Sequence, residues 1–144
     1  MDKTPVNPQD QAARPLVYSC SGCSSAAQLT NHLALRLDRA GVAEMSCIAG
    51  VGGGVPSLVR RAQAAAASGR AVVAIDGCAL ACAKASLLSR NVAPTLHVQL
   101  AECGVRKKYR ADFDAAQADE IFTRLEAQLR ALSVPRPVAS PTGA

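Results

Sequence analysis

The sequence predicts a small doubly wound α/β fold, flavodoxin- or Rossmann-like, in which helices flank a parallel sheet of about four strands. Short apolar stretches alternate with segments of helical periodicity over most of the 144 residues. Residues 16–18 and 71–75 are continuously apolar, which is typical of central strands covered on both faces. Residues 42–48 and 96–100 alternate apolar with polar residues, as edge strands do. Right-handed crossovers then give the strand order 2-1-3-4.

Helical periodicity predicts four helices between and after these strands. Gly41 ends the first helix, Pro56 suits the first turn of the second, and Asp114 caps the last. The glycine-rich residues 50–54 are predicted to form a turn before the second helix. The four predicted helices cover residues 24–40, 56–69, 79–89 and a segment from Asp114 that carries Ile121, Leu125 and Leu129 on one face.

Length and composition favour one domain over residues 15–132, because this chain length suits a single core. Residues 1–14 and 133–144 contain mostly polar residues and proline, and we expect flexible tails there. The start of the chain lacks the apolar core of a signal peptide, and no apolar run reaches the roughly 20 residues of a membrane span. We therefore expect a cytoplasmic protein with no membrane partner.

The net charge is +5, and the densest basic run is Arg106-Lys107-Lys108-Tyr109-Arg110. Nucleic-acid binders usually combine clustered cations with stacking aromatic residues, but only 3% of this chain is aromatic. Nucleic acid is therefore an unlikely partner. A solvated loop is the first interpretation of this run, and a contact with phosphate or an acidic partner is the alternative. No particular protein partner is indicated.

The six cysteines are the strongest functional signal. In a reduced compartment, cysteines indicate metal or thiol chemistry more than disulfides. Cys20 and Cys23 follow the first predicted strand, whereas Cys78 and Cys82 follow the third. The carboxyl ends of these two strands lie at the point where the strand order reverses, which is where such sheets bind ligands. The two pairs are therefore predicted to face each other across one crevice.

Four thiolates in a tetrahedral array suit zinc, and the metal ion is the predicted ligand of this crevice. The Cys-x-x-Cys spacing of Cys20 and Cys23 lets two thiolates bind one ion. Cys78 and Cys82 lie four residues apart, so they would share one face of the helix predicted over 79–89. Helix N-termini at Cys23 and Cys78 would favour the thiolate. Simple packing of small buried cysteines is the alternative.

Other residues near the predicted crevice have open roles. Cys47 ends the second strand and is a candidate fifth ligand, a reactive thiol or a packing residue. Asp76 is a candidate second-shell partner of the site, an acceptor for backbone N–H groups, or the polar end of a strand. Gly52, Gly53 and Gly54 offer a possible anion-binding nest or a turn that allows close packing. Structural roles are expected for Cys103, His32 and His97.

Several of these motifs occur together in one known family. The motifs are Cys20-Ser21-Gly22-Cys23-Ser24-Ser25, Glu44-Met45-Ser46-Cys47, Gly52-Gly53-Gly54-Val55-Pro56 and Asp76-Gly77-Cys78 with Cys82. In this order they resemble the DGC-domain family, small bacterial and archaeal proteins named for the Asp-Gly-Cys motif. The resemblance covers about residues 15–130 and implies zinc bound by cysteines at positions among 20, 23, 47, 78 and 82. Cys103 departs from the family pattern.

Three functions are compatible with these residues. The first is a zinc-binding protein, either a metal carrier or a protein with a structural or regulatory metal site. The second is a thiol-based redox or sulfur-transfer enzyme that uses the same cysteines. The third is a scaffold for an iron–sulfur cluster, because such clusters are also held by thiolates.

Overall fold

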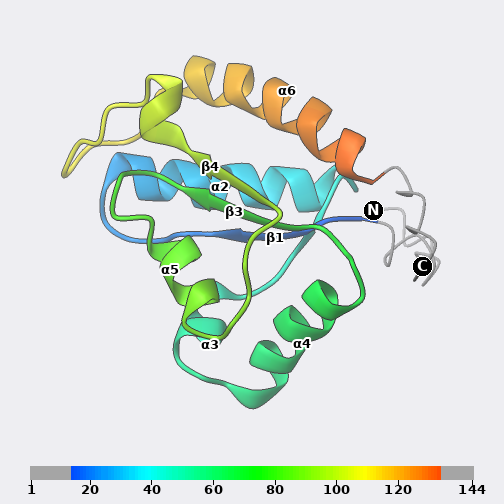
Figure 1. The fold of residues 1–144 in the computed structure, drawn as a ribbon. Helices are drawn as coiled ribbons and strands as arrows, with labels where there is room; N and C mark the ends of the chain where they lie inside the picture. Colours follow the sequence, from blue (N-terminus) through cyan, green and yellow to red (C-terminus); the bar gives the residue numbers. More distant parts are fainter. Residues whose placement is uncertain (1–13, 134–144) are drawn as a thin grey trace.

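The computed structural model describes residues 14–133, which form an α/β fold around one four-stranded sheet (Figure 1). The strand order is β2-β1-β3-β4, and every neighbouring pair is parallel. The predicted fold class, the strand order and the central position of the two apolar strands are confirmed. The tails predicted at the two ends lie almost entirely outside the described residues. The strands are β1 Leu16–Ser19, β2 Glu44–Met45, β3 Val72–Asp76 and β4 Leu96–Gln99.

The helices begin where the sequence supplies caps. The Ser24 hydroxyl accepts a hydrogen bond from the Ala27 N–H at 3.1 Å, and the Asp114 carboxylate accepts one from the Gln117 N–H at 2.9 Å. These caps start the long helices α2 and α6 where they were predicted. The helices are α2 Ser25–Arg39, α3 Ile48–Gly52, α4 Pro56–Ala67, α5 Cys82–Leu88 and α6 Ala115–Leu132, with the 3-10 turn η1 Leu100–Cys103 after β4.

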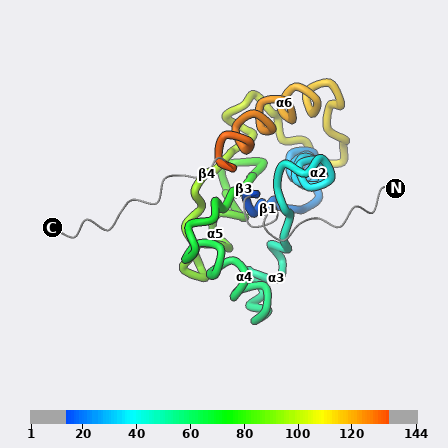
Figure 2. The backbone as a smooth tube through the Cα atoms, turned by 90° about the vertical axis from the view of Figure 1, so that its right-hand side faces the viewer, coloured from blue at the N-terminus to red at the C-terminus, as the bar shows by residue number. Residues whose placement is uncertain are grey.

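The sheet separates two hydrophobic cores. Helices α2 and α6 cover one face, and α3, α4 and α5 cover the other (Figures 1 and 2). Because side chains alternate along a strand, Val17 and Val73 pack under α2 and α6, whereas Tyr18 and Ala74 pack toward α4 and α5. Two covered faces explain why β1 and β3 have almost no polar residues.

The segment between β2 and α4 differs from the prediction. The second strand was expected over 42–48 but comprises only Glu44–Met45, and part of the predicted glycine turn forms the short helix α3. The Cys47 sulfur caps this helix, since it accepts a hydrogen bond from the Gly50 N–H at 3.4 Å. A side chain at Gly50 would collide with Leu58 of α4, so glycine permits close packing there.

The C-terminal end of α3 is stabilised from a distant part of the chain. The Arg90 guanidinium donates hydrogen bonds to the carbonyl oxygens of Val51 at 2.9 Å and Gly52 at 3.0 Å. These carbonyls belong to the last turn of the helix, where the regular helical hydrogen bonds end. The Val51 carbonyl also accepts the Gly54 N–H at 3.2 Å. A cap supplied from 38 residues further along the chain cannot be recognised in the local sequence pattern.

Helix α5 also begins later than predicted, at Cys82 and not near residue 79. The buried Asp76 carboxylate accepts hydrogen bonds from the backbone N–H groups of Ala83 at 2.7 Å and Lys84 at 3.1 Å. It therefore caps the helix from the end of β3, while Ala81 before the helix adopts a left-handed conformation with φ of 50°. Cys78 lies in the preceding turn, so the predicted shared helical face of Cys78 and Cys82 is wrong.

Replacing Asp76 by Ala should destabilise the protein more than replacing the exposed cap Asp114 by Ala. Asp76 also lies 2.8 Å from the His97 Nε2 atom, so the change removes three hydrogen bonds at a buried position. We expect a loss of about 2–4 kcal/mol in the free energy of unfolding, against about 1 kcal/mol for D114A. Urea unfolding followed by circular dichroism measures both values, and equal losses would contradict this role.

Candidate functional site

Four cysteines gather at the carboxyl end of the sheet, where the loops after β1, β3 and β4 lie together at the left of Figure 1. Cys20 and Cys23 follow β1, and Cys78 and Cys82 follow β3. All of them line one cavity of about 260 Å³, which we call the four-cysteine pocket. It lies at the reversal of strand order, the usual ligand position in such sheets.

Cys20 forms the buried wall of this pocket. Its sulfur lies 3.2 Å from the Thr30 hydroxyl and accepts a hydrogen bond from the Gly77 N–H at 3.3 Å. Burial raises the pKa of the Cys20 thiol, and the hydrogen bonds from Thr30 and Gly77 oppose that rise. Gly77 approaches α2 so closely that an added Cβ would lie 2.8 Å from the Ala26 carbonyl carbon. The backbone of this motif is thus fixed against the helix that follows Cys23.

The other three cysteines lie nearer the surface. Cys23 and Cys82 are exposed, and Cys78 is half-buried. Cys23 precedes the N-cap of α2, Cys82 is the first residue of α5, and Cys78 lies in the turn between β3 and α5. The pocket therefore has one buried thiol and three accessible ones. These side chains belong to turns and helix starts, where they can reorient without disturbing the two cores.

A lysine that the sequence prediction did not include also lines the pocket. Lys107 follows η1, and its ammonium nitrogen lies 3.6 Å from the Cys78 sulfur and 5.4 Å from the centre of the Tyr109 ring. The pKa of Lys107 is raised, first by its interaction with the Tyr109 hydroxyl and also by the charge of an ionised Cys78. Since β4 neighbours β3, the loop after β4 reaches the same edge of the sheet. The predicted position of β4 next to β3 could therefore have indicated that this loop lies near the cysteines.

Cys47 is not among the residues that line the four-cysteine pocket. It is exposed and caps α3, which follows β2, the strand on the far side of β1 from β3. The candidate anion nest of Gly52, Gly53 and Gly54 lies next to it, and two of its N–H groups have partners within the chain. The N–H of Gly53 donates to the Ala49 carbonyl at 2.8 Å, and that of Gly54 to the Val51 carbonyl at 3.2 Å. These two N–H groups are therefore used within the turn that ends α3.

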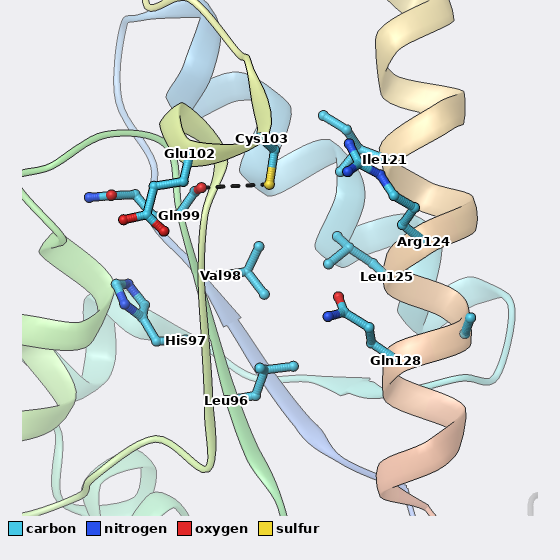
Figure 3. Close-up of a pocket in the computed structure, with 11 residues that line it drawn as sticks. Leu96, His97, Val98, Gln99, Glu102, Cys103, Ile121, Arg124, Leu125 and Gln128 are labelled. Carbon is cyan, nitrogen blue, oxygen red and sulfur yellow. Dashed lines mark hydrogen bonds between the residues drawn. The ribbon is translucent and has the colours of Figure 1, made fainter.

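Asp76 lies below the pocket, at the end of β3. Its carboxylate accepts the backbone hydrogen bonds described above, which is one of the roles predicted for it. Its partner His97 lies on β4 and extends away from α6 in Figure 3. Through the start of α5, Asp76 fixes the backbone position of Cys82. Sequence reasoning treated His97 as structural and did not pair it with Asp76.

A larger cavity than the four-cysteine pocket lies elsewhere, between β4 and α6 (Figure 3). It measures about 530 Å³, and its walls combine aliphatic side chains such as Val98 and Leu125 with charged ones and with polar ones such as Gln128. Cys103 points into it and donates a long hydrogen bond of 3.7 Å to the Gln99 carbonyl. This cavity contains no second cysteine, so Cys103 is separate from the four-cysteine pocket.

The conformation of the pocket is not that of a completed ligand shell. Within residues 14–133, no three or more histidine, cysteine or acidic side chains lie close enough together to hold a metal ion. The pocket brings thiols to one cavity, and an ion would require their sulfur atoms to converge further.

In the same part of the chain, no helix has the length and apolar character needed to cross a lipid bilayer.

Comparison with known proteins relates this chain to a family. The model of the DGC domain matches residues 16–125, which include all four pocket cysteines and Lys107. The chain is 59% identical over 112 residues to the anaerobic and virulence modulator AnvM of Pseudomonas aeruginosa, covering 78% of this chain and 82% of that protein. No solved structure matches. A match over most of the described fold shows that the chain belongs to the DGC-domain family.

Proposed function

We propose that the four-cysteine pocket binds a thiophilic metal ion, with zinc as the first choice. The observation that supports this most is that thiols from two separate crossover loops line one small cavity. Cys20, Cys23, Cys78 and Cys82 would be the ligands. Four thiolates are a common zinc donor set, with Zn–S bonds of about 2.3 Å. Cys47 is left out because it does not line the pocket.

The chemistry of the donor set fits this proposal. Three of the four thiols lie in turns or at a helix start, so their side chains can move toward Cys20. Cys20 must lose its proton to bind the ion, and burial opposes that loss until a metal is present. A zinc ion bound by four thiolates carries a net negative charge. The Lys107 ammonium, 3.6 Å from Cys78, would offset part of that charge.

The similar protein from Pseudomonas aeruginosa is named a modulator, which favours a regulatory role over an enzymatic one for this chain. A metal that joins the loops after β1 and β3 would fix the surface around them. Occupancy of the pocket would then control what this end of the sheet can bind. We therefore propose a regulatory metal site, in which the ion stabilises one conformation of the two loops.

A second candidate function is thiol chemistry at Cys78. The observation that favours it is the contact between Cys78 and Lys107. A neighbouring cation stabilises the thiolate, which is the nucleophilic form of cysteine. The Cys78 thiolate would attack the S–S bond of a small disulfide, form a mixed disulfide and release one thiolate. One of the three other thiols that line the cavity would then displace the second thiolate, which leaves a disulfide in the pocket and the small disulfide reduced to two thiols. This reaction and metal binding use the same sulfur atoms and would exclude each other.

Zinc content tests the first proposal. Protein purified without added metal should contain about one zinc ion per chain, whereas C78S and C23S should lose most of it because a ligand is missing. C103S is the matched control, since Cys103 is also half-buried but lies in another cavity. C47S should also keep its zinc. Elemental mass spectrometry gives the content, and circular dichroism checks the fold. Full zinc content in both C78S and C23S would exclude the proposed ligand set.

Alkylation of the metal-free protein tests the second candidate. Iodoacetamide should modify Cys78 faster than the buried Cys20, and Lys107→Ala should slow the reaction at Cys78 roughly threefold. Lys107→Arg keeps the charge and should preserve the rate. Lys108→Ala is the control on the same loop. Peptide mass spectrometry over time measures each site, and an unchanged rate in K107A would rule out activation by this lysine.

A further inference from the structure

The basic run 106–110 is a fixed loop in the structure. Ser25, the first residue of α2, donates its N–H to the Lys108 carbonyl at 2.8 Å, and its hydroxyl accepts the Lys108 N–H at 2.9 Å. Just before the run, Val105 is buried and its N–H donates to the Leu100 carbonyl at 3.1 Å. A loop held in this way presents its side chains at a low entropic cost of binding.

The side chains of this loop form an exposed, positively charged surface. All five residues from Arg106 to Arg110 are exposed. Among residues 14–133, none of the four cations in the run forms an ion pair with a carboxylate. Elsewhere in the fold, Arg36, Arg61 and Arg70 each form one. The loop is therefore a concentrated positive surface without direct ion pairs to carboxylates.

Exposed apolar surface lies beside this charge. Leu80 is 70% exposed and Tyr109 is 67% exposed, the two largest values among the large hydrophobic residues of the described chain. They come from different loops, and both line the four-cysteine pocket together with Lys107. Exposed apolar residues surrounded by polar ones are typical of interaction sites, and tyrosine and arginine are enriched in protein interfaces. We call this surface, made of Leu80 and residues 106–110, the basic rim.

We propose that the basic rim is a docking surface for an acidic segment of a partner protein that carries apolar side chains. Acidic groups of the partner would pair with the cations of the loop, and an apolar side chain would pack on Leu80 and Tyr109. This surface goes beyond the proposed metal site, because none of its residues is a candidate ligand. A bound partner would cover the entrance of the four-cysteine pocket, and its affinity would depend on the arrangement of the loops around the pocket.

A protein segment fits this surface better than the other anionic ligands. The pocket volume of about 260 Å³ is below the roughly 300–1,000 Å³ typical of small-molecule sites. A nucleic-acid backbone would pair with the cations but would leave the aliphatic Leu80 without an apolar partner. Single-stranded nucleic acid is usually bound through several stacking aromatic residues, whereas the rim offers only Tyr109.

The test uses the full-length protein and a fluorescein-labelled peptide in which leucines are flanked by glutamates. Fluorescence anisotropy should show binding that weakens as salt is added. Lys108→Glu combined with Arg110→Glu should weaken binding about tenfold or more, because it removes the net positive charge of the rim. Arg60→Glu combined with Arg124→Glu changes the net charge equally on exposed positions of α4 and α6, and should keep the affinity within about twofold.

Leu80→Ser tests the apolar contribution. This change should weaken binding of the leucine peptide several-fold. It should leave unchanged the affinity for a peptide in which serines replace the leucines. Equal losses in the two charge-reversal variants, or no effect of L80S, would overturn the proposal. Tighter binding of a labelled single-stranded DNA than of the peptide would overturn it in favour of a nucleic-acid surface. Zinc content of every variant is measured in parallel, so that failure of the metal site and failure of the rim are distinguished.

Discussion

The parallel pairing of β1 with β3 is the interaction on which the candidate site depends. Ser19 lies opposite Ile75 in this pair, and the Cys20 N–H extends it with a hydrogen bond to the Ile75 carbonyl at 3.0 Å. This pairing brings two loops that are far apart in sequence to the same edge of the sheet. The Gly77 N–H can then reach the Cys20 sulfur, and the thiols that follow each strand share one cavity. A shift of one residue in this register would move the side chains of one strand to the opposite face of the sheet and displace its loop from the other.

The order of the strands was predictable because strands that are buried on both faces contain almost only apolar residues. Apolar runs identified β1 and β3 as central, helical spacing of apolar residues located α2, and the Asp114 cap located the start of α6. The positions of Cys20 and Cys78 at strand ends followed from the same reasoning. Strand ends in a parallel sheet are fixed by hydrogen bonds that neighbouring strands share, so an assignment of strands also assigns the loops that meet.

The errors in prediction have a common cause, which is contact with residues distant in sequence or in a different element. Asp76 of β3 fixes the start of α5, so Cys78 lies in a turn and not on the helix. Arg90 stabilises the end of α3, which glycine content alone would not predict as helical. The sequence prediction missed Lys107 because its approach to Cys78 depends on the hydrogen bond by which Ser25 fixes the neighbouring residue Lys108. Each of these contacts joins segments that no local pattern connects.

The charges of the pocket and of the loop above it are physically related. Thiols that ionise or bind a metal place negative charge at the carboxyl edge of the sheet, where the buried Asp76 already contributes a carboxylate. Lys107 is the cation nearest to the thiols, and its neighbours in the loop add positive potential within a Debye length of about 10 Å. Deprotonation of the pocket thiols would neutralise part of this positive potential. Removal of a metal ion from the thiolates would change the potential again. A partner that binds through the loop would therefore respond to the state of the thiols without contacting them.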